Sequence, residues 1–120
     1  LGSFSIVPLV VGRAAAGEVA EVLERAWGGD ETLVVVSTDL SHYHDYETAQ
    51  RLDRRTCAAI EALRFEDLGR DSACGSVPLG GLLCLARRHG LRVTTVDLRN
   101  SGDTAGDRER VVGYGAWLVG

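Results

Sequence analysis

The apolar residues of this chain recur with two different periods, which predict strands and helices in alternation. Residues 4–11 form a short apolar run rich in β-branched side chains, and residues 33–37 form a second apolar run that ends in a serine. The first is typical of a strand, and the second of a strand buried on both faces. Apolar residues at helical spacing predict a helix over residues 16–27 between them. A strand, a helix and a strand in this order predict a parallel pair, 4–11 with 31–38, joined by a right-handed crossover.

The remainder of the chain predicts two more helices and two more strands. Asp45 is placed to cap the first of these helices and Ser76 the second, which runs to the capping residue His89 beside a glycine. Residues 91–98 and 111–119 predict strands. We therefore expect residues 1–120 to form a single α/β domain, a layered fold with a mixed, mainly parallel sheet flanked by helices.

Composition narrows the class of protein. Hydrophobic residues make up 45% of the 120 residues and charged residues 25%, as in ordinary globular proteins. A net charge of −4 argues against nucleic acid or an anionic membrane as the main partner. The three cysteines show no framework spacing, so we expect reduced thiols and a cytoplasmic protein. We also expect the protein to be bacterial.

Polar residues follow the second predicted strand at once. Asp39, His42 and His44 stand at its carboxyl end, where open α/β sheets bind ligands. The alternative is that Asp39 is only a turn former and that the histidines lie on an ordinary exposed loop. The His-x-His spacing alone is a weak signal for a metal.

Cys74 is the second candidate, in the stretch DSACGSVPLGG. It precedes a predicted helix N-terminus, where free N–H groups and the helix dipole stabilise a thiolate. A thiolate is both a nucleophile and a soft metal ligand. The alternative is a small buried hydrophobe, which is our interpretation of Cys57 and Cys84 inside helices. The long loop Asn100–Arg110 is expected to line or cover the same opening.

Three blocks of the sequence resemble the C-terminal half of the Memo-like family, which is component B of the AmmeMemoRadiSam grouping. They are VVVSTDLSHYHDY, ACGSVPLGGLL and NSGDTAGDRERVVGYGAW. That family is similar in fold to class III extradiol ring-opening dioxygenases, so the resemblance implies half of such a fold. It also implies iron or copper as cofactor, redox behaviour and a small-molecule substrate. By this resemblance His42 and Cys74 line a metal pocket and Asp39 matches the aspartate of the same block. We do not assign His44 a role from this resemblance.

The family's other metal-binding histidines lie in its N-terminal half. We therefore expect the chain to be part of a longer Memo-like protein, with the missing half or another protein chain as its partner. Two further hypotheses remain from the residues themselves. Cys74 is a nucleophile activated by His42 and oriented through Asp39 in a hydrolase, or the chain is a non-catalytic interaction protein with a vestigial pocket.

Overall fold

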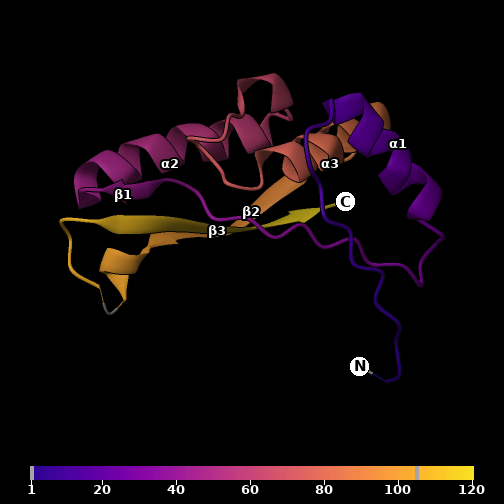
Figure 1. Ribbon diagram of the computed structural model, residues 1–120, viewed down its shortest axis with the longest axis horizontal. Coiled ribbons are helices and arrows are strands. Elements are labelled where there is room, and N and C mark those ends of the chain that lie inside the picture. Colours follow the sequence, from indigo (N-terminus) through magenta and orange to yellow (C-terminus); the bar gives the residue numbers. More distant parts are fainter. Residues whose placement is uncertain (1, 105) are drawn as a thin grey trace.

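The computed structural model describes residues 2–104 and 106–120, which form three helices and a small sheet (Figure 1). The helices are α1 (Ala16–Ala26), α2 (Tyr46–Glu61) and α3 (Ser76–Arg88), and short 3₁₀ turns span Phe65–Asp67 and Ser101–Asp103. The strands are β1 (His42–His44), β2 (Val93–Asn100) and β3 (Val111–Val119). In Figure 1 the helices lie on one side of the sheet, and the other side is open.

The predicted helices are confirmed, with one correction at a cap. The side chain of Asp45 accepts a hydrogen bond from the Thr48 backbone N–H at 3.0 Å and so begins α2 as expected. Helix α3 is capped by Gly75 and not by Ser76. The reason is that the chain already turns before the helix, because the Ser76 N–H donates to the carbonyl of Ala73 at 3.1 Å.

The prediction of a mainly parallel sheet is wrong. Strand β3 lies in the middle and pairs antiparallel with both β1 and β2, in the order β1-β3-β2. Neither residues 4–11 nor residues 31–38 form a strand in the described chain, so the expected parallel pair is not formed. Apolar runs predict an extended backbone, but they do not specify which neighbour supplies the backbone hydrogen bonds.

The segment that follows the second apolar run, residues 33–37, is hydrogen-bonded to the sheet only from Leu40 onward. There the Leu40 N–H donates to the Gly113 carbonyl at 2.8 Å, and the Gly113 N–H donates to the Ser41 carbonyl at 2.9 Å. These bonds continue the antiparallel pairing of β1 with β3 toward the candidate site. The polar residues after the apolar run are therefore held by the sheet, although the run itself is not.

Helix α3 is the centre of the hydrophobic core. On one side it packs against α1 through a cluster formed by Val19, Ala20, Leu23, Leu82, Cys84 and Leu85. On the other side a second cluster joins it to α2 and to the start of β1, through Leu40, Ile60, Ala73, Leu79 and Leu83. Because most of its surface is apolar, α3 can fill both contacts at once.

The two glycines inside α3 make a matched test of this packing. A Cβ on Gly81 would overlap the Val19 side chain, whereas a Cβ on Gly80 would be 3.8 Å from Phe65 Cβ, an ordinary contact. Gly81→Ala is expected to destabilise the fold by about 1–3 kcal/mol through overpacking. Gly80→Ala is expected to stabilise it by up to about 1 kcal/mol through helix propensity. Denaturant unfolding measures both, and equal shifts of the same sign would contradict this account of the α1–α3 contact.

The open side of the molecule carries many exposed apolar side chains. Alternate residues of β3 point away from the helices, and among them Leu118 is 68% exposed. In the second apolar run Val34 and Val36 pack on the core, whereas Leu33 and Val35 are 85% and 77% exposed. We call the surface formed by Leu33, Val35, Val96, Tyr114 and Leu118 the uncovered face. The prediction that the second run is buried on both faces is therefore wrong for this structure.

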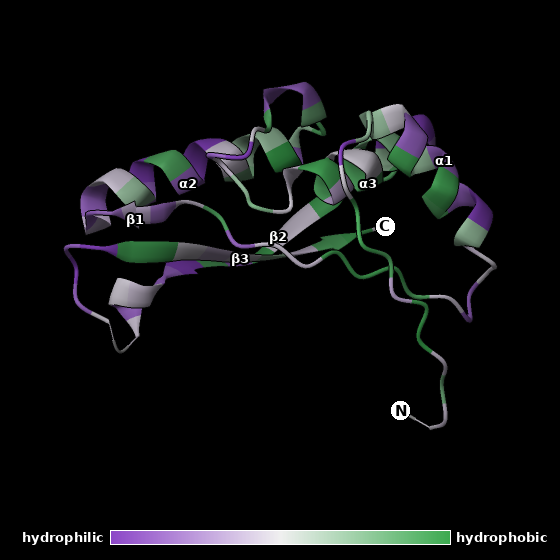
Figure 2. Cartoon of the chain, viewed as in Figure 1, coloured by the Kyte–Doolittle hydropathy of each residue, from purple (hydrophilic) through white to green (hydrophobic). Residues whose placement is uncertain are grey.

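The N-terminal segment is the second exposed apolar feature. Phe4, Ile6, Val7, Leu9 and Val10 are all exposed in an extended stretch that runs away from the helices (Figure 1). Figure 2 shows this stretch as mostly hydrophobic. A soluble monomer rarely exposes so much contiguous apolar surface without a partner. None of the helices in the described residues has both the length and the apolar character needed to cross a bilayer.

Candidate metal centre

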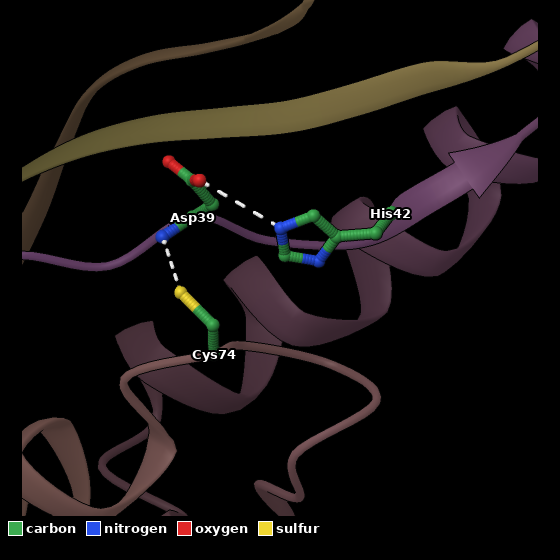
Figure 3. Close-up of side chains that lie close together, drawn as sticks. All are labelled: Asp39, His42 and Cys74. Atoms are coloured by element: carbon green, nitrogen blue, oxygen red, sulfur yellow. Dashed lines mark hydrogen bonds and ion pairs between the residues drawn. The ribbon is translucent and has the colours of Figure 1, made fainter.

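The structure brings Asp39, His42 and Cys74 together, as the sequence predicted. Each offers one ligand atom, and these three atoms lie within 4.8 Å of one another (Figure 3). Two ligands bonded to one ion at about 2.0–2.3 Å lie at most about 4.6 Å apart. A carboxylate, an imidazole and a thiolate therefore already stand at nearly the spacing that a shared metal ion requires.

The backbone of Asp39 holds Cys74 in place from two directions. The Asp39 N–H donates a hydrogen bond to the Cys74 sulfur at 3.2 Å, and the Asp39 carbonyl accepts one from the Cys74 N–H at 3.2 Å. These two bonds join stretches that are 35 residues apart in the sequence. They fix the position of the sulfur beside the Asp39 carboxylate, before any ion is bound.

Thr38 is a supporting residue that the sequence analysis missed. Its hydroxyl donates to the Asp39 carbonyl at 2.8 Å and accepts the Gly75 N–H at 2.8 Å, and it lies 3.7 Å from the Cys74 sulfur. A Cβ on Gly75 would stand 2.8 Å from the Ser37 carbonyl oxygen, so only glycine permits this approach. Thr38 stands next to Asp39 inside the block VVVSTDLSH, and this position was the available signal.

His42 is aimed by an irregularity in β1. It pairs with Val112 and His44 pairs with Val111, so Tyr43 between them is an extra residue in the ladder, a β-bulge. Tyr43 has φ 66°, a left-handed conformation that is uncommon for a bulky side chain. Bulges often re-aim side chains beside functional sites. The His42 Nε2 lies 3.7 Å from the Asp39 Oδ2, and the imidazole is one-third exposed.

The other candidate residues lie apart from this cluster. His44 is exposed and is not among the three clustered side chains. Cys57 and Cys84 are each 7% exposed, which confirms their interpretation as buried hydrophobes. His89 is the C-cap of α3, as predicted, and its Nε2 also pairs with the Glu24 carboxylate at 2.7 Å.

The described part of the loop Asn100–Arg110 packs on the start of α2. The Tyr46 N–H donates to the Arg108 carbonyl at 2.9 Å, and the Tyr46 hydroxyl donates to the Asp103 carboxylate. Within residues 2–104 and 106–120, no hydrogen bond joins this loop to Cys74. That this loop covers the candidate site remains a prediction.

Hydrogen bonds shift the protonation of three groups near the start of α2. The bond from Tyr46 lowers the pKa of Asp103, and the same bond raises the pKa of Tyr46. The Thr48 hydroxyl and backbone lower the pKa of Asp45. The lowered pKa values of the two carboxylates stabilise the fold at pH values above their usual pKa of 3.8. This stabilisation is lost as the pH falls through the pKa of the folded state. The raised pKa of Tyr46 stabilises the fold at pH values below its usual pKa of 10.0. This stabilisation is lost as the pH rises through the pKa of the folded state.

An α/β chain that gathers a carboxylate, an imidazole and a thiolate at the edge of an antiparallel sheet defines a class of candidate metal-binding proteins. Sequence comparison narrows this class, because the family described as Memo-like protein matches residues 1–118. The chain belongs to the Memo-like family.

Individual relatives agree with this assignment. A MEMO1 family protein of Methanosarcina mazei is 31% identical over 130 residues, which cover 97% of this chain and 48% of the relative. A MEMO1 family protein of Aquifex aeolicus is 34% identical, and the match covers 92% of this chain and 45% of the relative. One of Saccharolobus solfataricus is 30% identical, with 93% and 44% covered. The relatives thus come from archaea and bacteria, and the chain spans about half of their length.

Proposed function

We propose that this chain forms part of a metalloprotein that binds iron or copper through Asp39, His42 and Cys74. The observation that carries the proposal is the mutual spacing of their three ligand atoms, all within 4.8 Å. The donor set fits such ions, because thiolate and imidazole favour redox-active transition metals and a carboxylate completes a mixed site. Three protein ligands leave coordination positions open, which is typical of catalytic and not of structural sites.

Each side chain has a separate task in this proposal. Cys74 supplies the thiolate, whose sulfur the Asp39 N–H holds in position, and His42 supplies an imidazole nitrogen. Asp39 supplies a carboxylate that is about half exposed, so its second oxygen can also receive a proton from a bound substrate. A bound redox-active ion would supply the oxygen or electron-transfer chemistry of the extradiol ring-opening dioxygenases that the family resembles.

The hydrolase hypothesis receives less support from the same geometry. A cysteine nucleophile needs a hydrogen bond to its base, and that base needs a second one to its orienting group. Within the described residues the Cys74 sulfur contacts Thr38 and the Asp39 N–H, and the His42 Nε2 to Asp39 Oδ2 separation is 3.7 Å. A shared metal ion makes better use of these three positions.

Metal loading tests the proposal against this alternative. The protein encoded by the complete gene is expected to take up about one iron or copper ion per chain during anaerobic reconstitution, and to lose any turnover when a chelator removes the ion. Elemental analysis after desalting measures the loading. Activity that persists in excess chelator, with no stoichiometric metal, would support the cysteine nucleophile and reject the metal site.

A further inference from the structure

A cavity of about 990 Å³ opens beside the candidate metal centre. Its walls come from β1, from the second half of α2, from the 3₁₀ turn after α2 and from the loop that follows. This volume is at the upper end of the range of small-molecule sites. His42 belongs both to the wall of this cavity and to the cluster with Asp39 and Cys74, so the two features are adjacent.

The charge of the cavity wall is opposite to that of the whole chain. The net charge of the chain is −4, yet three arginines line the cavity, Arg55, Arg64 and Arg70, against the carboxylates Asp67 and Asp71. Two histidines of β1 add further nitrogen donors to the wall. A cavity lined by an excess of cations concentrates anions, because its walls focus the field of the fixed charges.

Two of the three arginines keep their hydrogen-bonding capacity for a ligand. The third, Arg64, donates a hydrogen bond from its Nε to the Asp67 carboxylate at 2.8 Å. Arg55 and Arg70 make no ion pair and no side-chain hydrogen bond with the other residues that the structure describes. A guanidinium offers a planar fork of donors that fits a carboxylate or a phosphate with two parallel bonds.

The rest of the lining fits an apolar body. Leu52, Ala58 and Ala59 contribute side chains of α2 to the same wall as Arg55, which lies on the same helix. Binding sites for small molecules typically combine such apolar surface with a few charged groups that fix orientation. The wall therefore offers both halves of a site for an amphipathic anion.

We propose that this cavity binds a small organic anion, with its carboxylate or phosphate on Arg55 and Arg70 and its apolar body against α2. His42 then lies beside the bound molecule, so the far end of the ligand is directed toward Asp39 and Cys74. As the binding pocket for a substrate, this assignment rests on the proposed metal function. The binding of the anion itself needs no metal.

The test uses the protein encoded by the complete gene, without added metal and in the presence of a chelator. Isothermal titration calorimetry compares benzoate, phenyl phosphate and neutral phenol as probes. We expect at least one anion to bind at least tenfold more tightly than phenol, and the tighter of the two identifies the preferred anionic group. Arg55→Gln and Arg70→Gln are each expected to weaken that binding at least tenfold. Arg92→Gln, directly before β2 and outside the cavity wall, is the matched control.

Three results would overturn the assignment. They are equal binding of anion and phenol, anion binding that both cavity variants retain, and no binding at about 10 mM probe, which is above ordinary KM values. Circular dichroism of each variant establishes that it is folded. Cys74→Ser separates this proposal from the metal function, because it is expected to remove metal binding and to leave the affinity for the anion within about twofold.

Discussion

Replacing Cys74 by serine is expected to lower the affinity for iron or copper by roughly 100-fold or more. Loss of a residue that only supports a metal ligand already costs about 10–100-fold, and Cys74 is proposed as a ligand itself. The serine hydroxyl is a weak ligand at neutral pH, whereas the thiolate binds these metals strongly. Competition with a chelator of known affinity measures the change.

Cys57→Ser is the matched control for this substitution. Cys57 is buried in α2, where its sulfur lies 3.3 Å from the Thr95 hydroxyl, so a serine at position 57 has a hydrogen-bond partner. It also lies outside the cluster of candidate ligands. Metal affinity is expected to be unchanged in this variant. A fall of equal size in both variants would show that the effect comes from folding and not from ligation.

The 120-residue chain alone is expected to self-associate at micromolar concentrations. It is also expected to bind metal at least tenfold more weakly than a longer protein that includes the region of the relatives that this chain does not match. Burial of each large apolar side chain of the uncovered face is worth about 1.5–3 kcal/mol, which favours any available partner. We propose that this partner is the N-terminal half, which also supplies further histidines. Sedimentation velocity and metal titration of the short and long proteins measure both effects.

Substitutions on the uncovered face provide the control. Leu33→Ser and Val35→Thr remove exposed apolar surface without touching the core, so they are expected to reduce self-association of the short chain. In the long protein the same changes are expected to destabilise the fold, because the face is then buried. A short chain that stays monomeric and binds metal as tightly as the long one would contradict the proposed partner.

Local signals in the sequence predicted the helices and the strands β2 and β3, but not how the strands of the sheet pair. Helix α2 begins after Asp45 because a side-chain cap and an apolar face are encoded within a few neighbouring residues. The runs 4–11 and 31–38 encode only an extended backbone. The strands that such runs pair with lie in distant parts of a sequence. The relatives are about twice as long as this chain, so residues outside it are available as pairing partners in them. The antiparallel pairing of β1 with β3 could not be predicted either, because β1 has only three residues.

The candidate site was easier to predict than the sheet around it. Asp39, His42 and Cys74 stand out because they are chemically distinctive residues at the ends of elements. Thr38 and the bulge at Tyr43 do not stand out, because their roles depend on backbone geometry. The arginines of the cavity lie on α2 and on the segment after it, so no single motif connects them.

X-ray absorption spectroscopy of the metal-loaded protein tests the central claim most directly, because it reports the atoms bonded to the ion. The account predicts one sulfur at about 2.3 Å, as in zinc–thiolate bonds, together with nitrogen and oxygen at about 2.0–2.2 Å. The sulfur contribution is expected to vanish in Cys74→Ser and to persist in Cys57→Ser. A coordination shell of nitrogen and oxygen alone in the unaltered protein would contradict ligation by Cys74 and with it the proposed centre.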